Sequence, residues 1–546
     1  ILLINLKNYL PHKKYIQSIS GFYQIGTLDE DYSYLKCLNN QSRLNKIAIE
    51  ERERYSDWIA NLNKHFLSKN LTYKSKISLF YFSDLSNKRN DLFNTFDLIC
   101  NRLLIEEIIS KNGYTKILIN GGNKNLFQSI SSIKNIKTQK INNLETYSML
   151  RIFSQNISNS LITRLLRNLR LILKYTLYRI FFLKIVYESK NKTYKSRNIF
   201  FTRFPKHFQG NIYKEDKYLY MVKKNDHFVT SLLCDGMYQN LGILNAILFR
   251  NSLKKSKKHI IIDDYVTFKN LIRSFYESII FFSKFKYLNS LKYYYKDINI
   301  SDSIYKELSL SYQRVLGTLV LCRGLKNVIK NVEAKKYIYH LHEYIYGRMI
   351  TFVLHNKGIR NTFGFQHGPS SLKLLLYNIS SKELPLSKHN YLNSVPLPNS
   401  VFAEDKKSAN IYKLSGYKNI ILLSKIPRLF YLYDLRLKNK KDINLIASGL
   451  HDFQLIYRTT LKEIKKKPNL KFLFKPHPRS NINLENYPLP DNAQYTKSHI
   501  KKLLTRTNKL YSSYSSVVSE AMFLNIDVCI IQFPGKVCLS SYEEEN

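Results

Sequence analysis

Three short segments of this 546-residue sequence carry side chains that can hold a phosphate or move a proton. They are Gln366-His367-Gly368, Lys475-Pro476-His477-Pro478 and the serine-rich run from Ser512 to Ser516. Histidine titrates near neutral pH and can act as a base. Lysine, histidine and serine can donate to phosphate oxygens, and a helix that begins at the serine run would add its free N–H groups. Taken alone, His367 fits a turn at a strand end as well as it fits chemistry.

The elements around the last two segments predict a parallel sheet. Apolar and amphipathic runs alternate there, which places strands within 443–449, 471–480, 508–525 and 527–535 and a helix over 452–468. Because the carboxyl ends of parallel strands meet at one edge, the two segments should converge. The unit contains neither GxGxxG nor GxxxxGK[ST], which excludes a dinucleotide fingerprint and a P-loop.

The first segment belongs to a second set of strands. Tyr-Ile-Tyr-His before Glu343 predicts a strand, and the following helix should run to about His355 and end at Lys357-Gly358. The next strand leads directly into His367. Glu343 and His367 should therefore lie on one rim of a parallel sheet.

A pair of acids, Asp263-Asp264, follows another apolar run that begins at His259. Acids at the end of a strand can face a ligand or a metal ion. They can equally cap the first turn of a helix. The sequence leaves both interpretations open.

The pattern predicts an α/β protein in four parts. They are an N-terminal α/β region (1–155), a basic amphipathic helical segment (156–195), the remainder of the N-terminal, acceptor-side Rossmann-like domain (196–430) and a C-terminal nucleotide-sugar-binding Rossmann-like domain (431–546), which could be truncated. In the second part, 159–187 has a basic residue every three to five positions and is too charged to cross a membrane. It fits a helix on an anionic membrane surface or a linker helix packed on its own domain.

Composition restricts the class of partner. The chain has 86 Lys and Arg against 40 Asp and Glu, a formal net charge of +46, which favours anionic partners such as acidic lipid, nucleic acid or nucleotide-activated substrates. No zinc-finger or RNP-like motif supports nucleic acid. The six cysteines are scattered, so neither a disulfide framework nor a zinc site is indicated, and a reducing cytosol is expected. The sequence begins at Ile1 and shows no signal peptide, so it could be a fragment or a processed chain.

The order and spacing of the motifs resemble those of bacterial surface-polysaccharide glycosyltransferases of the GT-B architecture. The chain is most similar to a surface carbohydrate biosynthesis family, and also to Kdo transferases, bacterial sialyltransferases and CDP-glycerol glycerophosphotransferases. The resemblance covers the whole chain and is best from about 330 to 535. It rests on Tyr339-His340-Leu341-His342-Glu343, Gly364-Phe365-Gln366-His367, Ile426-Pro427-Arg428, Lys475 to Pro478, and Ser515-Ser516 with Glu520. After Glu343 this chain has Tyr-Ile-Tyr-Gly-Arg where relatives have a polar-Pro-Trp-Glu run.

The resemblance implies a fold of two Rossmann-like domains facing a cleft, with a basic helical insertion, and it implies roles for nine residues. His367 and Glu343 would be catalytic. The donor-binding residues would be Lys475, His477, Arg479, Ser515, Ser516, Glu520 and Gly449. Enzymes of this kind need no cofactor and generally no divalent metal, because basic side chains and a helix terminus offset the charge of the leaving phosphate.

The expected function is transfer of a sugar, preferably a CMP-activated Kdo or sialic-like acid, to a lipid-linked or polysaccharide acceptor of the bacterial surface. A CDP-polyol phosphotransferase is the rival within the enzyme class. A non-catalytic basic protein at a membrane or on nucleic acid is the rival outside it, although nucleic acid is not favoured. The expected location is the cytoplasm, at the inner face of the plasma membrane if 159–187 contacts lipid.

Overall fold

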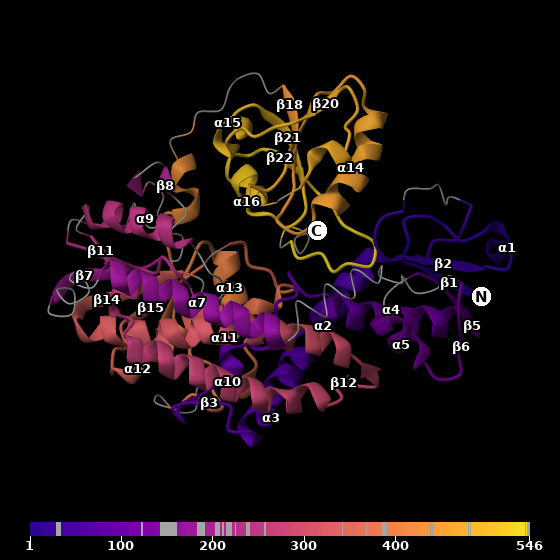
Figure 1. Cartoon of the computed structure of the whole chain (residues 1–546). Helices are drawn as coiled ribbons and strands as arrows, with labels where there is room; N and C mark the ends of the chain where they lie inside the picture. The colour runs from indigo at the N-terminus through magenta and orange to yellow at the C-terminus, as the bar shows by residue number, and fades with distance from the viewer. Residues whose placement is uncertain are drawn as a thin grey trace.

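The computed structural model shows a chain built around three parallel sheets (Figure 1). It describes residues 1–28, 34–121, 124–141, 161–182, 192–202, 208–209, 212–213, 221–223, 225–235, 241–255, 258–340, 342–366, 368–384, 390–433, 435, 442–478, 480, 482–540 and 542. The predicted catalytic His367 and the predicted donor ligand Arg479 lie outside these residues.

The first sheet has four strands in the order β2-β1-β5-β6. Its strands are β1 (Leu2–Asn5), β2 (Gly21–Gln24), β5 (Lys116–Asn120) and β6 (Lys137–Lys140). The helices of this region are α1 (Lys13–Ile16), α2 (Gln41–Asn61), α3 (Asn63–Ser68), α4 (Thr95–Asn112) and α5 (Lys124–Ser131).

The second sheet has seven strands in the order β11-β10-β7-β14-β15-β16-β17. Its strands are β7 (Tyr194–Phe201), β10 (His227–Thr230), β11 (His259–Ile261), β14 (Val332–His340), β15 (Thr362–Phe365), β16 (Ser400–Ala403) and β17 (Ile420–Leu422). Its helices are α7 (Leu161–Phe181), α9 (Ile243–Lys255), α10 (Phe268–Ser290), α11 (Ser301–Lys330), α12 (Ile345–Asn356) and α13 (Lys406–Leu414). One continuous apolar core joins this sheet to the first, with Leu2 and Ile117 contributed by one and Ile199 and Tyr339 by the other.

The third sheet is C-terminal and has five strands in the order β20-β19-β18-β21-β22. Its strands are β18 (Ile443–Ala447), β19 (Phe472–Lys475), β20 (Ala493–Tyr495), β21 (Thr507–Ser512) and β22 (Asp527–Ile530), and its helices are α14 (Phe453–Lys466), α15 (Ile500–Leu504) and α16 (Ser516–Phe523). Leu445 and Leu510 are buried on one face, and Ile446 and Phe474 on the other. Alternate side chains of a strand point to opposite faces, so a strand that is apolar throughout indicates a sheet covered on both sides.

Short antiparallel pairs complete the described strands. They are β3 (Thr72–Tyr73) with β4 (Ile77–Ser78), β8 (Phe208–Gln209) with β9 (Ile212–Tyr213), and β12 (Tyr294–Tyr295) with β13 (Ile298–Asn299).

The acid pair Asp263-Asp264 connects several elements of the fold through buried hydrogen bonds. Both acids lie in a 3-10 turn after β11 and are buried. The carboxylate of Asp264 accepts from Arg250 Nε and Nη2 at 3.0 and 2.9 Å and from the Tyr178 hydroxyl at 2.8 Å. Asp263 accepts from the Leu232 N–H at 2.6 Å and the Ser231 hydroxyl at 3.0 Å. The sequence left open whether this pair faces a ligand. Protein groups already donate hydrogen bonds to both acids, so their role is structural.

The basic segment is helical, as predicted, but its cations do not all lie along one outward face. Lys174 and Arg179 are buried, and they donate to the carbonyl oxygens of Leu233 (2.9 Å) and Val266. Tyr175 and Tyr178 are buried on the same side of α7. The packing of this helix on its own domain places Lys174 and Arg179 inside, which the charge spacing alone does not reveal. Arg167 and Arg170 remain exposed.

The buried pair of Asp264 and Arg250 gives a stability prediction. Replacing Asp264 with Ala leaves a buried guanidinium without its partner and should lower the free energy of unfolding by about 3–5 kcal/mol. An Arg250→Leu, Asp264→Leu double variant should recover much of this loss, because it removes both charges together. Urea unfolding followed by circular dichroism measures both. Asp442→Ala breaks the exposed pair with Arg506 and should change little; a double variant as unstable as the single one would contradict the prediction.

Candidate functional site: a cleft at the edge of the C-terminal sheet

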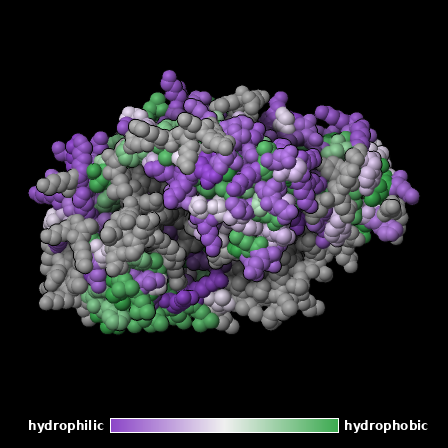
Figure 2. Space-filling view, turned by 90° about the horizontal axis from the view of Figure 1, so that it is seen from above, coloured by the Kyte–Doolittle hydropathy of each residue, from purple (hydrophilic) through white to green (hydrophobic). Residues whose placement is uncertain are grey.

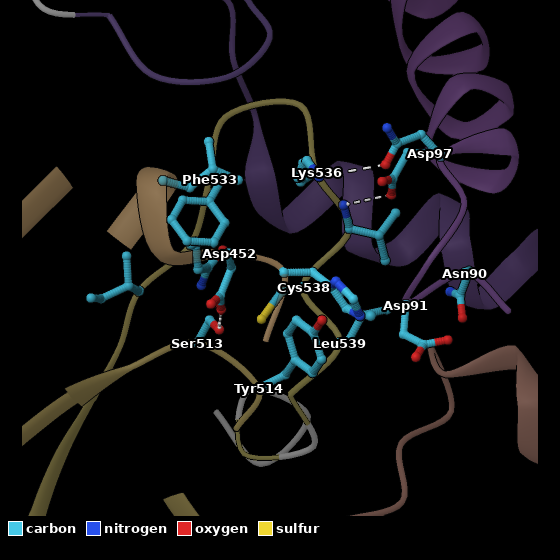
Figure 3. A pocket seen from close by; sticks show the side chains of 16 residues that line it. Asn90, Asp91, Asp97, Asp452, Ser513, Tyr514, Phe533, Lys536, Cys538 and Leu539 are labelled. Carbon is cyan, nitrogen blue, oxygen red and sulfur yellow. Dashed lines mark hydrogen bonds between the residues drawn. The ribbon is translucent and has the colours of Figure 1, made fainter. Parts of the chain in front are cut away.

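A cleft opens where the connections of the C-terminal sheet change direction (Figure 3). From β18 the chain proceeds outward to β19 and β20, then returns to the other side of β18 for β21 and β22. The switch point therefore lies between β18 and β21, and ligands of open parallel sheets bind outside the strand ends at such points. His451 and Asp452, which follow β18, line the cleft together with Ser513 and Tyr514, which follow β21.

Asp452 ties the two loops of the switch point together. Its side chain is buried, and it accepts a hydrogen bond from the Ser513 hydroxyl. Burial raises the pKa of this carboxyl group, while Ser513 and backbone N–H groups favour its charged form. A Cβ atom at Gly449 would approach Asp452 Oδ1 to 3.1 Å, so the glycine gives the acid room to reach across. The tie fixes the start of the serine run relative to β18.

The second wall of the cleft comes from the N-terminal body, by which we mean the four-stranded and seven-stranded sheets with their helices. Asn90, Asp91, Asn94 and Asp97, at and before the start of α4, face the loops of the C-terminal sheet. Burial raises the pKa of Asp97 to about 6, with Lys536 and the Val537 N–H acting in the opposite direction. This wall contributes carboxyl and amide side chains to the cleft.

The third wall is the chain that follows β22. Phe533, Lys536, Val537, Cys538 and Leu539 are among its lining residues (Figure 3). The backbone here is held by polar groups of the N-terminal body, to which it makes hydrogen bonds of 2.6–3.1 Å: Pro534 O from Gly26 N, Lys536 O from Gln41, Gly535 O from Asn101, Val537 N to Asp97, and Cys538 N to Asn45. Gly535 has φ +69°, and a Cβ there would come within 2.9 Å of Ile25. This segment joins the two sides of the cleft.

The cleft is narrow in this conformation. Its volume is about 70 Å³, whereas sites that hold a whole small-molecule ligand usually measure ~300–1,000 Å³. A phosphate-sized group fits, but a complete nucleotide requires the walls to move apart.

Ser515 and Ser516 lie at the start of α16, directly after two residues that line the cleft. Ser515 occupies the N-cap position, but its side chain makes no capping hydrogen bond, and Ser516 is exposed. The simplest structural explanation of the serine pair, helix capping alone, therefore does not describe Ser515. Its hydroxyl and the first N–H groups of α16 are hydrogen-bond donors at a helix N-terminus, which favours the binding of an anion there.

The other predicted donor ligands lie at the same edge of the sheet. Lys475 ends β19, is half-buried and donates to Ser498 O at 2.7 Å, and burial lowers the pKa of its ammonium group. His477 is half-buried two residues further on. Glu520 lies one turn into α16, and Gly449 follows β18. The sheet thus brings the loops that carry these residues to one edge, as predicted. None of these residues lines the narrow cleft itself. Their roles in binding stay predictions.

Glu343 follows β14 as predicted, but it is buried with 1% of its surface exposed and does not line the cleft. Its Oε2 lies 3.0 Å from His342 Nδ1, and burial raises the pKa of this carboxyl group to about 8. Burial lowers the pKa of His342 to about 3. At neutral pH the contact therefore joins two neutral groups, and Glu343 carries its proton.

A short series of contacts leads from this buried pair to the cleft. Tyr344 follows Glu343, and the Arg89 guanidinium lies 4.7 Å from the centre of its ring. Arg89 donates from Nε and Nη2 to the two oxygens of Asp91, at 2.7 and 2.6 Å. Asp91 lines the cleft, so Glu343 can influence the site through its neighbours without touching a ligand.

The motif around His367 has a clear structural basis in its described residues. A Cβ at Gly364 would lie 2.7 Å from Cγ of His342, so only glycine leaves room for that ring. Gln366 donates to Gly368 O at 2.8 Å and to the Ser408 hydroxyl at 3.1 Å, and it accepts from Glu404 N at 3.0 Å. Gly364 and Gln366 thus shape the end of β15, the strand that precedes His367 in the sequence.

The serine run singled out from the sequence contributes Ser513 and Tyr514 to the cleft, but the sequence interpretation missed its other lining residues. Asp452 had a local signal, an acid three residues after the strand-ending Gly449. Asp91 and Asp97 had none, because they are hundreds of residues from the C-terminal motifs and only folding brings them close. Lys536 follows the serine run more closely but belongs to no motif.

Within the described residues, no three histidine, cysteine or acidic side chains gather in a way that would hold a metal ion. That the protein uses no metal stays a prediction. No helix in the described part of the chain is both long and apolar enough to cross a bilayer.

Comparison with known proteins gives distant structural likenesses. No protein-family profile and no curated protein sequence matches the chain. Among solved structures, it is similar to UDP-GlcNAc 2-epimerase from Neisseria meningitidis (13% identity, 62% of this chain and 82% of that chain, TM-score 0.33). It is also similar to the calicheamicin glycosyltransferase CalG4 (10% identity, 64% and 83%, TM-score 0.36) and to the wall teichoic acid polymerase TagF (14% identity, 68% and 79%, TM-score 0.29).

The predicted α/β, GT-B-like fold class is confirmed. The seven-stranded and five-stranded parallel sheets are Rossmann-like, and the four-stranded sheet is an addition on the N-terminal side. The division at residues 155, 195 and 430 stays a prediction.

The uncapped Ser515 gives a prediction that separates anion binding from helix capping. Ser515→Ala should change the free energy of unfolding by less than about 0.5 kcal/mol, because no capping bond is lost. Asp405→Ala is the matched control, since Asp405 caps α13 by accepting from Ser408 N at 2.6 Å, and its loss should cost about 1 kcal/mol. Thermal and urea unfolding measure both; equal losses would show that Ser515 acts as a cap.

The protonated Glu343 predicts a pH effect on stability. Its pKa is about 8 in the folded protein against 4.5 ordinarily, so between these values the folded state keeps a proton that the unfolded state has released. Stability should therefore fall as the pH rises through this range. Glu343→Gln should remove a pH-dependent loss on the order of 3–5 kcal/mol between pH 5 and pH 9. Urea unfolding at several pH values tests this, with Glu333→Gln in the preceding strand β14 as an exposed control; parallel curves for Glu343→Gln and wild type would contradict it.

Proposed function

We propose that this protein is a glycosyltransferase that moves a sugar from a nucleotide-activated donor to an acceptor of a bacterial surface glycan. The observation that carries the proposal is the cleft at the switch point of the C-terminal sheet. The motifs shared with surface-polysaccharide glycosyltransferases support the choice of reaction.

The phosphate of the donor belongs at the start of α16. The Ser515 hydroxyl is not used for capping, and the first N–H groups of the helix face the same end. Lys475 and His477 lie at the end of the neighbouring strand series and can offset the charge of the leaving nucleotide. Glu520, one turn into the helix, would accept from ribose hydroxyls. This arrangement supplies its positive charge from the protein, so we expect the reaction to need no divalent metal.

In the reaction, an acceptor hydroxyl attacks the anomeric carbon of the sugar. A new carbon–oxygen bond forms, the bond from that carbon to the phosphate oxygen breaks, and the nucleotide leaves with the electron pair. A base must take the proton of the hydroxyl. Glu343, with its pKa raised to about 8, is already protonated at neutral pH. We therefore assign the base role to His367 and a positioning role to Glu343.

The donor is a CMP-activated acidic sugar, Kdo or a sialic-like acid, in our proposal, because the Lys-Pro-His-Pro and Ser-Ser motifs resemble those of enzymes with such donors. A lipid-linked or polysaccharide acceptor completes the reaction, at the inner face of the plasma membrane. A CDP-polyol phosphotransferase would use the same wall of the cleft. In that reaction the acceptor hydroxyl attacks the phosphorus next to the polyol, the phosphorus–oxygen bond to CMP breaks, and CMP leaves with the electron pair.

A panel of nucleotides tests the proposal. CMP, CDP, CDP-glycerol, UDP and GDP are each added to the whole protein, and the melting temperature is recorded. A ligand that binds the folded state at 100 times its Kd stabilises it by ~2.7 kcal/mol, so CMP should raise the melting temperature most. Stabilisation by CDP-glycerol above CMP would favour the polyol phosphotransferase, and stabilisation by none would contradict the proposal and favour a non-catalytic protein.

Charge-matched variants locate the binding site. Lys475→Ala and His477→Ala should each lower the apparent affinity for CMP at least tenfold, as judged from the shift in melting temperature. Lys471→Ala removes an exposed cation just before the same strand, at the opposite edge of the sheet, and should leave the shift unchanged. Equal losses for Lys471→Ala and Lys475→Ala would show a nonspecific effect of net charge.

A further inference from the structure

An exposed apolar face lies on α7 and α9, neither of which contributes a residue to the cleft. On α7, Leu166, Leu169, Leu173, Ile180 and Phe181 are 50–64% exposed, and on α9 Leu244 and Leu248 are 73% and 60% exposed. The two helices pack against each other. Figure 2 shows hydrophobic side chains gathered at the lower left, the side on which Figure 1 places α7 and α9. We call these seven side chains the α7–α9 face.

This face is a fixed surface of the fold. Leu166, Leu169, Leu173 and Ile180 are three, four and seven residues apart, so they form one stripe along α7. The opposite side of the helix is locked inward, because Tyr178 donates to Asp264 and Lys174 to Leu233 O. Rotation of α7 to bury the stripe would break these contacts. The apolar side chains therefore need an external partner.

The charges beside the face identify that partner. Arg167 and Arg170 are exposed next to the stripe, and neither α7 nor α9 contains an acid. A second copy of this chain would bring the same cations against each other. An anionic lipid surface instead takes apolar side chains among its acyl chains and cations at its headgroup phosphates. The net charge of +46 attracts the whole molecule to such a surface.

We propose that the α7–α9 face binds the surface of an anionic membrane, with α7 lying in the plane of the bilayer. This goes beyond the proposed transfer reaction and does not depend on it. In the structure, the residues that would contact the membrane are exposed leucines and two arginines, rather than a continuous basic face.

Vesicle sedimentation tests the proposal with the whole protein. Wild type is mixed with phosphatidylcholine vesicles that contain either no anionic lipid or 30% phosphatidylglycerol. It should sediment with the anionic vesicles and partition at least tenfold more weakly onto the neutral ones. Leu173→Glu, Ile180→Glu should reduce anionic binding about tenfold or more, and Arg167→Glu, Arg170→Glu should remove the preference for anionic lipid.

Matched controls keep the result interpretable. Leu470→Glu introduces the same change at an exposed leucine of the C-terminal unit and should leave vesicle binding unchanged. Each variant should keep the wild-type melting temperature and nucleotide response, so failure here is distinguishable from failure of the transferase proposal. Wild type that ignores anionic vesicles at low salt, or α7 variants that bind as wild type does, would overturn the proposal. So would a concentration-dependent dimer in light scattering that Leu173→Glu, Ile180→Glu abolishes, since that would assign the face to a second copy.

Discussion

The hydrogen bonds of residues 534–538 to the N-terminal body hold the two sides of the cleft at their present distance. This segment leaves the last strand of the C-terminal sheet, yet its peptide groups are satisfied by Gln41, Asn45, Asp97 and Asn101. Buried backbone groups need partners, so a polar surface of the N-terminal body is required wherever this segment lies. The width of the cleft depends on this contact. A complete nucleotide can enter only if some of these hydrogen bonds rearrange.

The wall on the N-terminal side is held in place by buried charges. Asp84 pairs with Arg314 of α11, and Lys88 pairs with Glu383 at 2.6 Å. Arg348 of α12 donates to the Ser86 hydroxyl at 2.7 Å. Removing one partner of such a buried pair is far more costly than removing both. The loop that carries Arg89 and Asp91 to the cleft is therefore anchored to the seven-stranded sheet through the helices that cover it.

Burial also changes the chemistry that the motif near Glu343 can perform. A carboxyl group in an apolar site prefers its neutral form, and the rings of Tyr412 and Tyr417 lie within 5.7 Å of the neighbouring His342 ring. A neutral acid can donate a hydrogen bond and orient its surroundings, but it cannot accept a proton. In the proposed reaction, Glu343 would therefore be a positioning residue and not the base.

The sequence alone determined the elements and the order in which chemistry-bearing residues follow them. Strand and helix periodicity predicted β14, β15, β18, β19, β21 and α16 close to their observed bounds, and parallel connections placed their ends at common edges. The sequence also predicted α7, because its basic residues recur at helical spacing. What it could not show is which side of each helix and loop faces the interior.

Only the tertiary structure decided that Asp263 and Asp264 are structural and that Lys174 and Arg179 point inward. It also decided that Glu343 is buried and that Asp91, Asp97 and Lys536 line the cleft. Local spacing carries no information about partners that lie hundreds of residues away. Whether a charged side chain is paired, protonated or exposed depends on those distant partners, and they are set when the sheets pack against each other.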